Sequence, residues 1–196
     1  MRILSGDVRR GEVLRIRAAI LFADMRDFTG LSAHLPEEAA TALVNDYYDC
    51  IVPPIDERGG EVLKFMGDGI LAIFRAGEDA DSEACLRAFA AARAGLLRVA
   101  RHNTASNIRF DVGIALHFGN AAFGNVGSGA RLDYTVIGAD VNLASRIADL
   151  CGELGEGLLL SNAFQSRLSE QELRRLGVFP LKGVDEAQAV FAPVGP

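Results

Sequence analysis

The chain has 196 residues, is 49% hydrophobic and carries a formal net charge of −6, which suits one well-buried globular domain. Tracking a nucleic-acid backbone requires clustered Lys and Arg, so the acidic balance argues against a nucleic-acid partner. No apolar run reaches the roughly 20 residues that cross a bilayer, and no signal-peptide pattern opens the chain. We therefore expect no membrane span and a cytoplasmic location.

Residues 1–16 are charged and irregular, which is typical of a lead-in or the stub of a connector, and we place the folded domain at 17–196. An apolar run at 18–24 has the length of a buried strand. The helical spacing of apolar residues from Pro36 onward predicts a helix that must end or kink at Pro53-Pro54.

Residues 60–74, "GEVLKFMGDGILAIF", predict two strands joined by a tight Gly-Asp-Gly turn, which puts Asp68 at a hairpin tip. An amphipathic pattern then predicts a helix over 81–101.

Further along, residues 108–129 predict two strands broken at Gly119-Asn120, and 131–138 predict another before a helix over 139–151. The tail predicts a strand at 157–161, a short helix around 162–175 and a final strand pair at 178–184 and 189–194. Helices alternate with strands, but two connections are hairpins. The pattern therefore favours an α+β fold with a mixed, ferredoxin-like sheet.

Two aspartates stand where apolar strands end. Asp24 and Asp68 lie 44 positions apart, but a helix between two strands returns the chain so that strand ends become neighbours. Paired carboxylates are a common way to hold Mg²⁺ together with substrate phosphates. Each aspartate alone is better explained as a turn or loop residue, so it is the joint placement that favours a metal site.

Several other polar residues are candidates for binding an anionic substrate. The backbone N–H groups around Phe28 and Thr29, near a helix start, can receive a phosphate. Asn142 and Arg146 lie on one narrow polar stripe of an apolar helix, where an arginine can stabilise a transferring phosphoryl group. The stripe is equally explained as a solvated face with an Arg146–Asp149 pair.

Two lysines complete the set of candidates. Lys64 lies on a predicted strand with Val62 and Met66 on its own face, and its ammonium group needs an acceptor. Lys182, beside a glycine, also fits an ordinary surface lysine.

Four stretches, "LFADMRDFTGLS", "EVLKFMGDGILAIF", "FGNVGSGARLDYTVIGADVNLASRI" and "PLKGV", together resemble the class III nucleotidyl cyclase catalytic domain, in family order over about residues 17–192. The resemblance implies adenylate cyclase activity, which makes 3′,5′-cyclic AMP and pyrophosphate from ATP in a homodimer with two shared active sites. The connector-like residues 1–16 also allow a sensory or membrane module N-terminal to this chain.

The resemblance assigns roles to particular residues. Asp24 and Asp68 would hold two Mg²⁺ or Mn²⁺ ions per active site, with the Met25 backbone carbonyl as an added ligand. Asn142 would orient the ribose and Arg146 would stabilise the α-phosphate. The substrate-binding set would comprise Lys64, Thr135, Lys182, Arg131, Phe28 and Thr29.

Within that set, Lys64 and Thr135 match the base-selecting positions, and their types fit adenine, because lysine donates to N1 and threonine accepts from the 6-amino group. Threonine there resembles a bacterial adenylate cyclase subgroup. Asp27 replaces a common family glycine, and it either weakens triphosphate binding or points to solvent. A guanylate or purine-relaxed cyclase and a silent nucleotide-binding domain stay open as alternatives.

Overall fold

The computed structural model describes residues 13–128, 131–169 and 171–195. Eight strands lie in this part of the chain: β1 Val13–Met25, β2 Glu61–Met66, β3 Gly69–Arg75, β4 Val112–Ser128, β5 Arg131–Ile137, β6 Leu158–Ser161, β7 Leu173–Phe179 and β8 Gln188–Pro193. The helices there are α1 Phe28–Ser32, α2 Glu37–Glu57, α3 Asp81–Ala105, α4 Ala139–Leu154 and α5 Asn162–Gln165. None of them is long and apolar enough to cross a membrane.

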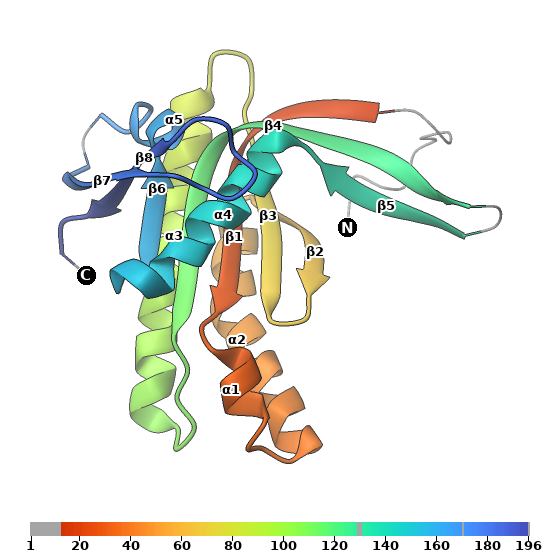
Figure 1. Ribbon diagram of the computed structural model, residues 1–196, viewed down its shortest axis with the longest axis vertical. Coiled ribbons are helices and arrows are strands. Elements are labelled where there is room, and N and C mark those ends of the chain that lie inside the picture. Colours follow the sequence, from red (N-terminus) through yellow and green to blue (C-terminus); the bar gives the residue numbers. More distant parts are fainter. Residues whose placement is uncertain (1–12, 129–130, 170, 196) are drawn as a thin grey trace.

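The strands form one mixed sheet in the order β2-β3-β1-β4-β6-β8-β7, and β5 pairs with the outer half of β4. The central strand β1 is antiparallel to both β3 and β4, whereas β4 and β6 are parallel. The first four sheet positions, with α2 and α3 as crossovers, have the ferredoxin-like arrangement. The predicted α+β class is confirmed. Figure 1 shows the β4–β5 hairpin extending beyond the rest of the sheet.

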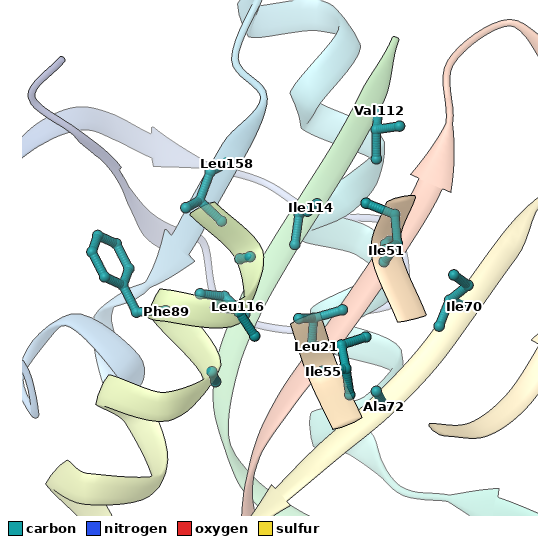
Figure 2. Packing of buried hydrophobic residues seen from close by; sticks show 14 of the residues in the cluster. Leu21, Ile51, Ile55, Ile70, Ala72, Phe89, Val112, Ile114, Leu116 and Leu158 are labelled. Carbon is teal, nitrogen blue, oxygen red and sulfur yellow. The ribbon is translucent and has the colours of Figure 1, made fainter. Parts of the chain in front are cut away.

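The two faces of the sheet are covered by different helices. On one face α2 and α3 pack against Leu21, Ile70 and Ile114 in the larger buried cluster, part of which Figure 2 shows. On the other face α4 packs through two smaller clusters that include Ile20 of β1 and Ala115 of β4. Because β1 and β4 are covered on both sides, their central stretches are apolar at nearly every position.

Three element boundaries differ from the predictions. β1 begins at Val13, so residues 13–16, which were assigned to the lead-in, pair with β4. Helix α2 does not end at its proline pair but runs on to Glu57, since Ile55, only 1% exposed, continues its apolar face. The predicted break at Gly119-Asn120 is also wrong, because both residues stay in the ladder opposite β1.

The C-terminal region holds less helix than predicted. Helix α5 has only four residues, and Leu173 to Arg175, expected at the end of a helix, belong to β7. Their backbone groups pair with β8, opposite Pro193, Ala192 and Phe191. Lys182, which was expected on a strand at 178–184, lies in a turn between β7 and β8.

Candidate active site

Asp24 and Asp68 lie side by side at one end of the sheet. Asp24 is opposite Gly69 in the β1–β3 ladder, so the turn that precedes Gly69 is its neighbour. The Met25 N–H donates to the Asp68 carbonyl at 3.3 Å, which joins the end of β1 to the β2–β3 turn. The hairpin tip predicted for Asp68 is confirmed, and the fold brings the two carboxylates together.

The pKa of Asp24 is strongly perturbed. Burial, the negative charge of Asp68 and a hydrogen bond to the Asp68 side chain raise the pKa of Asp24 to about 7, against a smaller lowering effect of the Met25 backbone. Two carboxylates that repel each other at a partly buried edge fit a hard divalent cation, which supplies the missing positive charge. Among the described residues no cluster of three or more His, Cys, Asp or Glu offers a larger ligand set.

The turn that carries Asp68 is anchored from α2. The Tyr48 hydroxyl donates to the Gly67 carbonyl, and the Tyr48 ring lies 4.6 Å, centroid to centroid, from the ring of Phe65. Gly67 has φ +68°, a left-handed conformation that glycine adopts without strain. Sequence reasoning missed this role of Tyr48. The available signal was a tyrosine on α2, one position away from the apolar stripe of that helix.

Lys64 lies on the same face of the sheet as Asp24. A bulge between Val62 and Lys64 sets Lys64 opposite Leu71, while Asp24 is opposite Gly69, two residues away on the same strand. Val62 therefore points to the other face, so its predicted sharing of a face with Lys64 is wrong. The Lys64 side chain is exposed.

Helix α4 carries Asn142 and Arg146 across this same face. Arg146 pairs with Asp149 at 3.0 Å, and both side chains are about half exposed. Asn142 is exposed. Within the described residues, no hydrogen bond or ion pair joins Asn142 or Arg146 to the carboxylate pair. The Asp149 charge is nevertheless among the causes that raise the pKa of Asp24.

The segment between the C-terminal end of β1 and the start of α2 contains Phe28 and Thr29, in the first turn of α1. Asp27, which precedes this helix, has φ 49° and is exposed. Its carboxylate lies over Gly30, where a Cβ would come within 2.6 Å of an Asp27 oxygen. The exposed position agrees with the second interpretation of Asp27, a side chain that points to solvent.

The remaining predicted site residues are Lys182, Thr135 and Arg131. Lys182 is exposed, directly after Leu181, which is buried beneath α4. Thr135 and Arg131 belong to β5, opposite Gly124 and Ser128 of β4. Their side chains lie outside the described part of the structure.

Comparison with known proteins identifies the family. The family profile "Adenylate and Guanylate cyclase catalytic domain" matches residues 15–192. An adenylate cyclase of Anabaena cylindrica is 33% identical over 184 residues, covering 89% of this chain and 36% of the relative. Adenylate cyclase 1 of Rhizobium meliloti is 29% identical, covering 92% of this chain and 28% of the relative. The chain thus spans about a third of these relatives.

Solved structures agree with this match. The adenylyl cyclase CyaB from P. aeruginosa superposes with a TM-score of 0.79 at 26% identity, covering 94% of this chain and 97% of that one. The guanylyl cyclase Cya2 gives 0.77 at 28% identity, covering 95% and 96%. Both nucleotide classes therefore occur among similar proteins. The chain belongs to the family of class III adenylate and guanylate cyclase catalytic domains, whose members use divalent metal ions.

Proposed function

We propose that this chain is the catalytic domain of an adenylate cyclase that converts ATP to 3′,5′-cyclic AMP and pyrophosphate. The observation that carries the proposal is the adjacent Asp24–Asp68 pair with its strongly raised Asp24 pKa. A carboxyl group whose pKa is raised by burial and by a neighbouring carboxylate is typical of functional sites.

Asp24, Asp68 and the Met25 backbone carbonyl would hold two Mg²⁺ or Mn²⁺ ions. When bound, these ions lower the pKa of the ribose 3′-hydroxyl and neutralise the triphosphate. The 3′-oxygen forms a bond to the α-phosphorus, the bond from that phosphorus to the β-phosphate bridging oxygen breaks, and the hydroxyl proton passes to solvent.

The other residues bind and orient the nucleotide. Asn142 would hold the ribose, and Arg146 would place its guanidinium against the charge that develops on the α-phosphate. Lys182, the backbone N–H groups of Phe28 and Thr29, and in a lesser role Arg131 would bind the remaining phosphates.

The same geometry supports a homodimer. Arg146 is engaged by Asp149 of its own helix rather than by the carboxylate pair, so within one protomer the two groups are not joined. In an active dimer the carboxylates of one protomer would meet Asn142 and Arg146 of its partner. A preceding sensory module is proposed as well, since the relatives are about three times longer than this chain.

The direct test is to incubate purified protein at several concentrations with ATP or GTP plus Mg²⁺ or Mn²⁺. Cyclic AMP, cyclic GMP and pyrophosphate are then quantified by chromatography. Cyclic AMP with equal pyrophosphate, rising faster than linearly with protein concentration, is expected. ATP binding without any cyclic product would instead favour a silent regulatory domain.

A complementation assay tests the shared sites. Asp24→Ala and Arg146→Ala are each expected to be inactive, whereas their mixture regenerates one working site per heterodimer. Subunit exchange is verified by mass spectrometry of tagged chains. Persistent inactivity despite exchange would refute sites built from two protomers.

A guanylate or purine-relaxed cyclase is the second candidate, favoured by the 28% identity to the guanylyl cyclase Cya2. Lys64 and Thr135 support ATP instead, because their hydrogen-bonding groups complement the adenine edge. The double variant Lys64→Glu with Thr135→Cys separates the two. A clear loss of cyclic AMP formation supports the adenylate assignment, and a slight change supports the relaxed enzyme.

A further inference from the structure

A chain of polar contacts crosses the protein on the α4 side, outside the residues assigned above. It starts at Ser161, at the end of β6, and runs through His117 of β4 to Asp140 of α4. His117 is 4% exposed and Ser161 is 1% exposed. His117 Nδ1 lies 2.8 Å from Ser161 Oγ, and His117 Nε2 lies 3.3 Å from Asp140 Oδ1.

One protonation pattern fits the contacts on the Ser161 side of His117. Ser161 Oγ accepts from the Phe164 N–H at 3.2 Å, so its own hydrogen is available to donate to His117 Nδ1. The imidazole proton then lies on Nε2, facing Asp140. The second Asp140 oxygen accepts from the Asn120 N–H at 2.6 Å. The 3.3 Å approach of His117 Nε2 to Asp140 does not have hydrogen-bond geometry, and within the described residues this buried nitrogen has no hydrogen-bond partner.

Ser, His and Asp also form hydrolytic triads, but this arrangement does not act as one. Ser161 is almost fully buried, and its hydroxyl oxygen caps the first turn of α5. A nucleophile in that position has no path to a substrate. The contacts join elements instead: they tie α4 to β4, and β4 to β6.

Asp140 is the second residue of α4, whose N-terminus has no side-chain cap. Its carboxylate is therefore the polar attachment of that first turn to the sheet, through His117 and the Asn120 backbone. Asn142 and Arg146 follow on the same helix, so the position of the first turn sets where they stand.

We propose that the Asp140 carboxylate, bonded to the Asn120 N–H and lying close to His117, is a positioning device that fixes the start of α4 on β4 and so holds Asn142 and Arg146 in place for cyclisation. The catalytic part of this inference rests on the proposed function. His117 and Asp140 are positioning residues and touch no substrate.

The absence of a side chain at Gly119 leaves the space that the Asp140 carboxylate occupies. A Cβ at Gly119 would overlap the Asp140 carboxylate and come within 2.8 Å of the Asp140 Cβ. Gly119 is not among the residues with positive φ, so alanine fits its backbone. Gly119→Ala therefore expels the Asp140 carboxylate without removing any hydrogen-bonding group.

The test compares Gly119→Ala and Asp140→Ala with Asp140→Asn in the full chain. In Asp140→Asn the amide oxygen still accepts from Asn120 N–H and the amide NH₂ reaches His117, which can switch its tautomer, so this variant should rescue the wild-type behaviour. Val99→Ala is the stability control, because Val99 is 5% exposed in α3 on the opposite face of the sheet.

Two readouts are measured, hydrogen exchange of the amides in the first two turns of α4 and the split between kcat and KM for ATP. Gly119→Ala and Asp140→Ala are expected to exchange at least about tenfold faster there. Their kcat should fall about ten- to a hundredfold with KM within about threefold, because roughly 1 Å of misplacement costs up to about a hundredfold. Val99→Ala should change neither readout.

The inference is overturned if Gly119→Ala and Asp140→Ala exchange like the wild type, or if exchange rises while kcat is unchanged. A wild-type protein that makes no cyclic nucleotide contradicts the proposed function instead, and the exchange readout then still decides whether Asp140 holds α4.

Discussion

Removing the charge of Asp24 should stabilise the metal-free protein at alkaline pH. Because the folded-state pKa of Asp24 is raised from 3.8 to about 7, the folded state binds more protons than the unfolded state between these values. The favourable contribution is complete below about pH 4 and is lost as pH rises through about 7. Asp24→Asn keeps the shape of the side chain but never carries the charge.

The magnitude follows from the pKa difference. A rise of about 3 pKa units corresponds to about 4 kcal/mol, and screening at this partly exposed edge reduces the measurable part to about 2 kcal/mol. We expect the stability advantage of Asp24→Asn over wild type to grow by about 1 kcal/mol as pH rises from 5 to 8. Mn²⁺ at about 100 times its dissociation constant should then stabilise wild type by about 2.7 kcal/mol but not the variant.

The assay is urea unfolding at pH 5, 6, 7 and 8 in EDTA, followed by the same series with Mn²⁺. Asp56→Asn, which removes an exposed carboxylate from α2, controls for the loss of one negative charge. A stability difference between Asp24→Asn and wild type that stays constant from pH 5 to pH 8 would refute the electrostatic argument. Equal stabilisation of both proteins by Mn²⁺ would refute the metal assignment.

Three further variants test neighbouring parts of the site. Tyr48→Phe removes the hydroxyl that donates to the Gly67 carbonyl, which should cost about 1 kcal/mol and raise the Mn²⁺ concentration needed for half-maximal turnover; an unchanged metal titration would contradict this anchor. Asp27→Gly removes the strain of a φ of 49° but raises the conformational entropy of the unfolded chain, so the free energy of unfolding should stay within about 0.5 kcal/mol of wild type. Turnover should stay within about twofold, as a kinetic assay at saturating ATP can check. Arg146→Lys keeps the charge but loses the planar fork, so kcat should fall about a hundredfold while the affinity for a non-hydrolysable ATP analogue, measured by calorimetry, is retained.

Much of the site could be predicted because local patterns define it. An apolar run that ends on Asp24 and a Gly-Asp-Gly turn at Asp68 are short-range signals, and the β1–β3 register places them together. The polar stripe of α4 was equally visible from its spacing. The choice between a solvated Arg146–Asp149 pair and a site residue was not, because that pair does form within the protomer.

The features that could not be predicted depend on contacts between distant segments. The bulge before Lys64 changes the face to which Val62 points, and no local residue signals it. Gly119 resembled a strand break, but it continues the ladder and leaves room for Asp140 of a later helix. The extension of α2 past its prolines likewise depends on the burial of Ile55 against the sheet.

The sheet order gives the two carboxylates unequal mechanical support. Asp24 is the penultimate residue of the central strand β1, which is held on both sides by ladders with β3 and β4. Asp68 lies at the tip of a hairpin whose outer strand, β2, forms the edge of the sheet. Edge hairpins open at lower free energy than central strands. Adjustment of the site to cations of different radius would therefore come from movement of the Asp68 turn, with Asp24 as the fixed point.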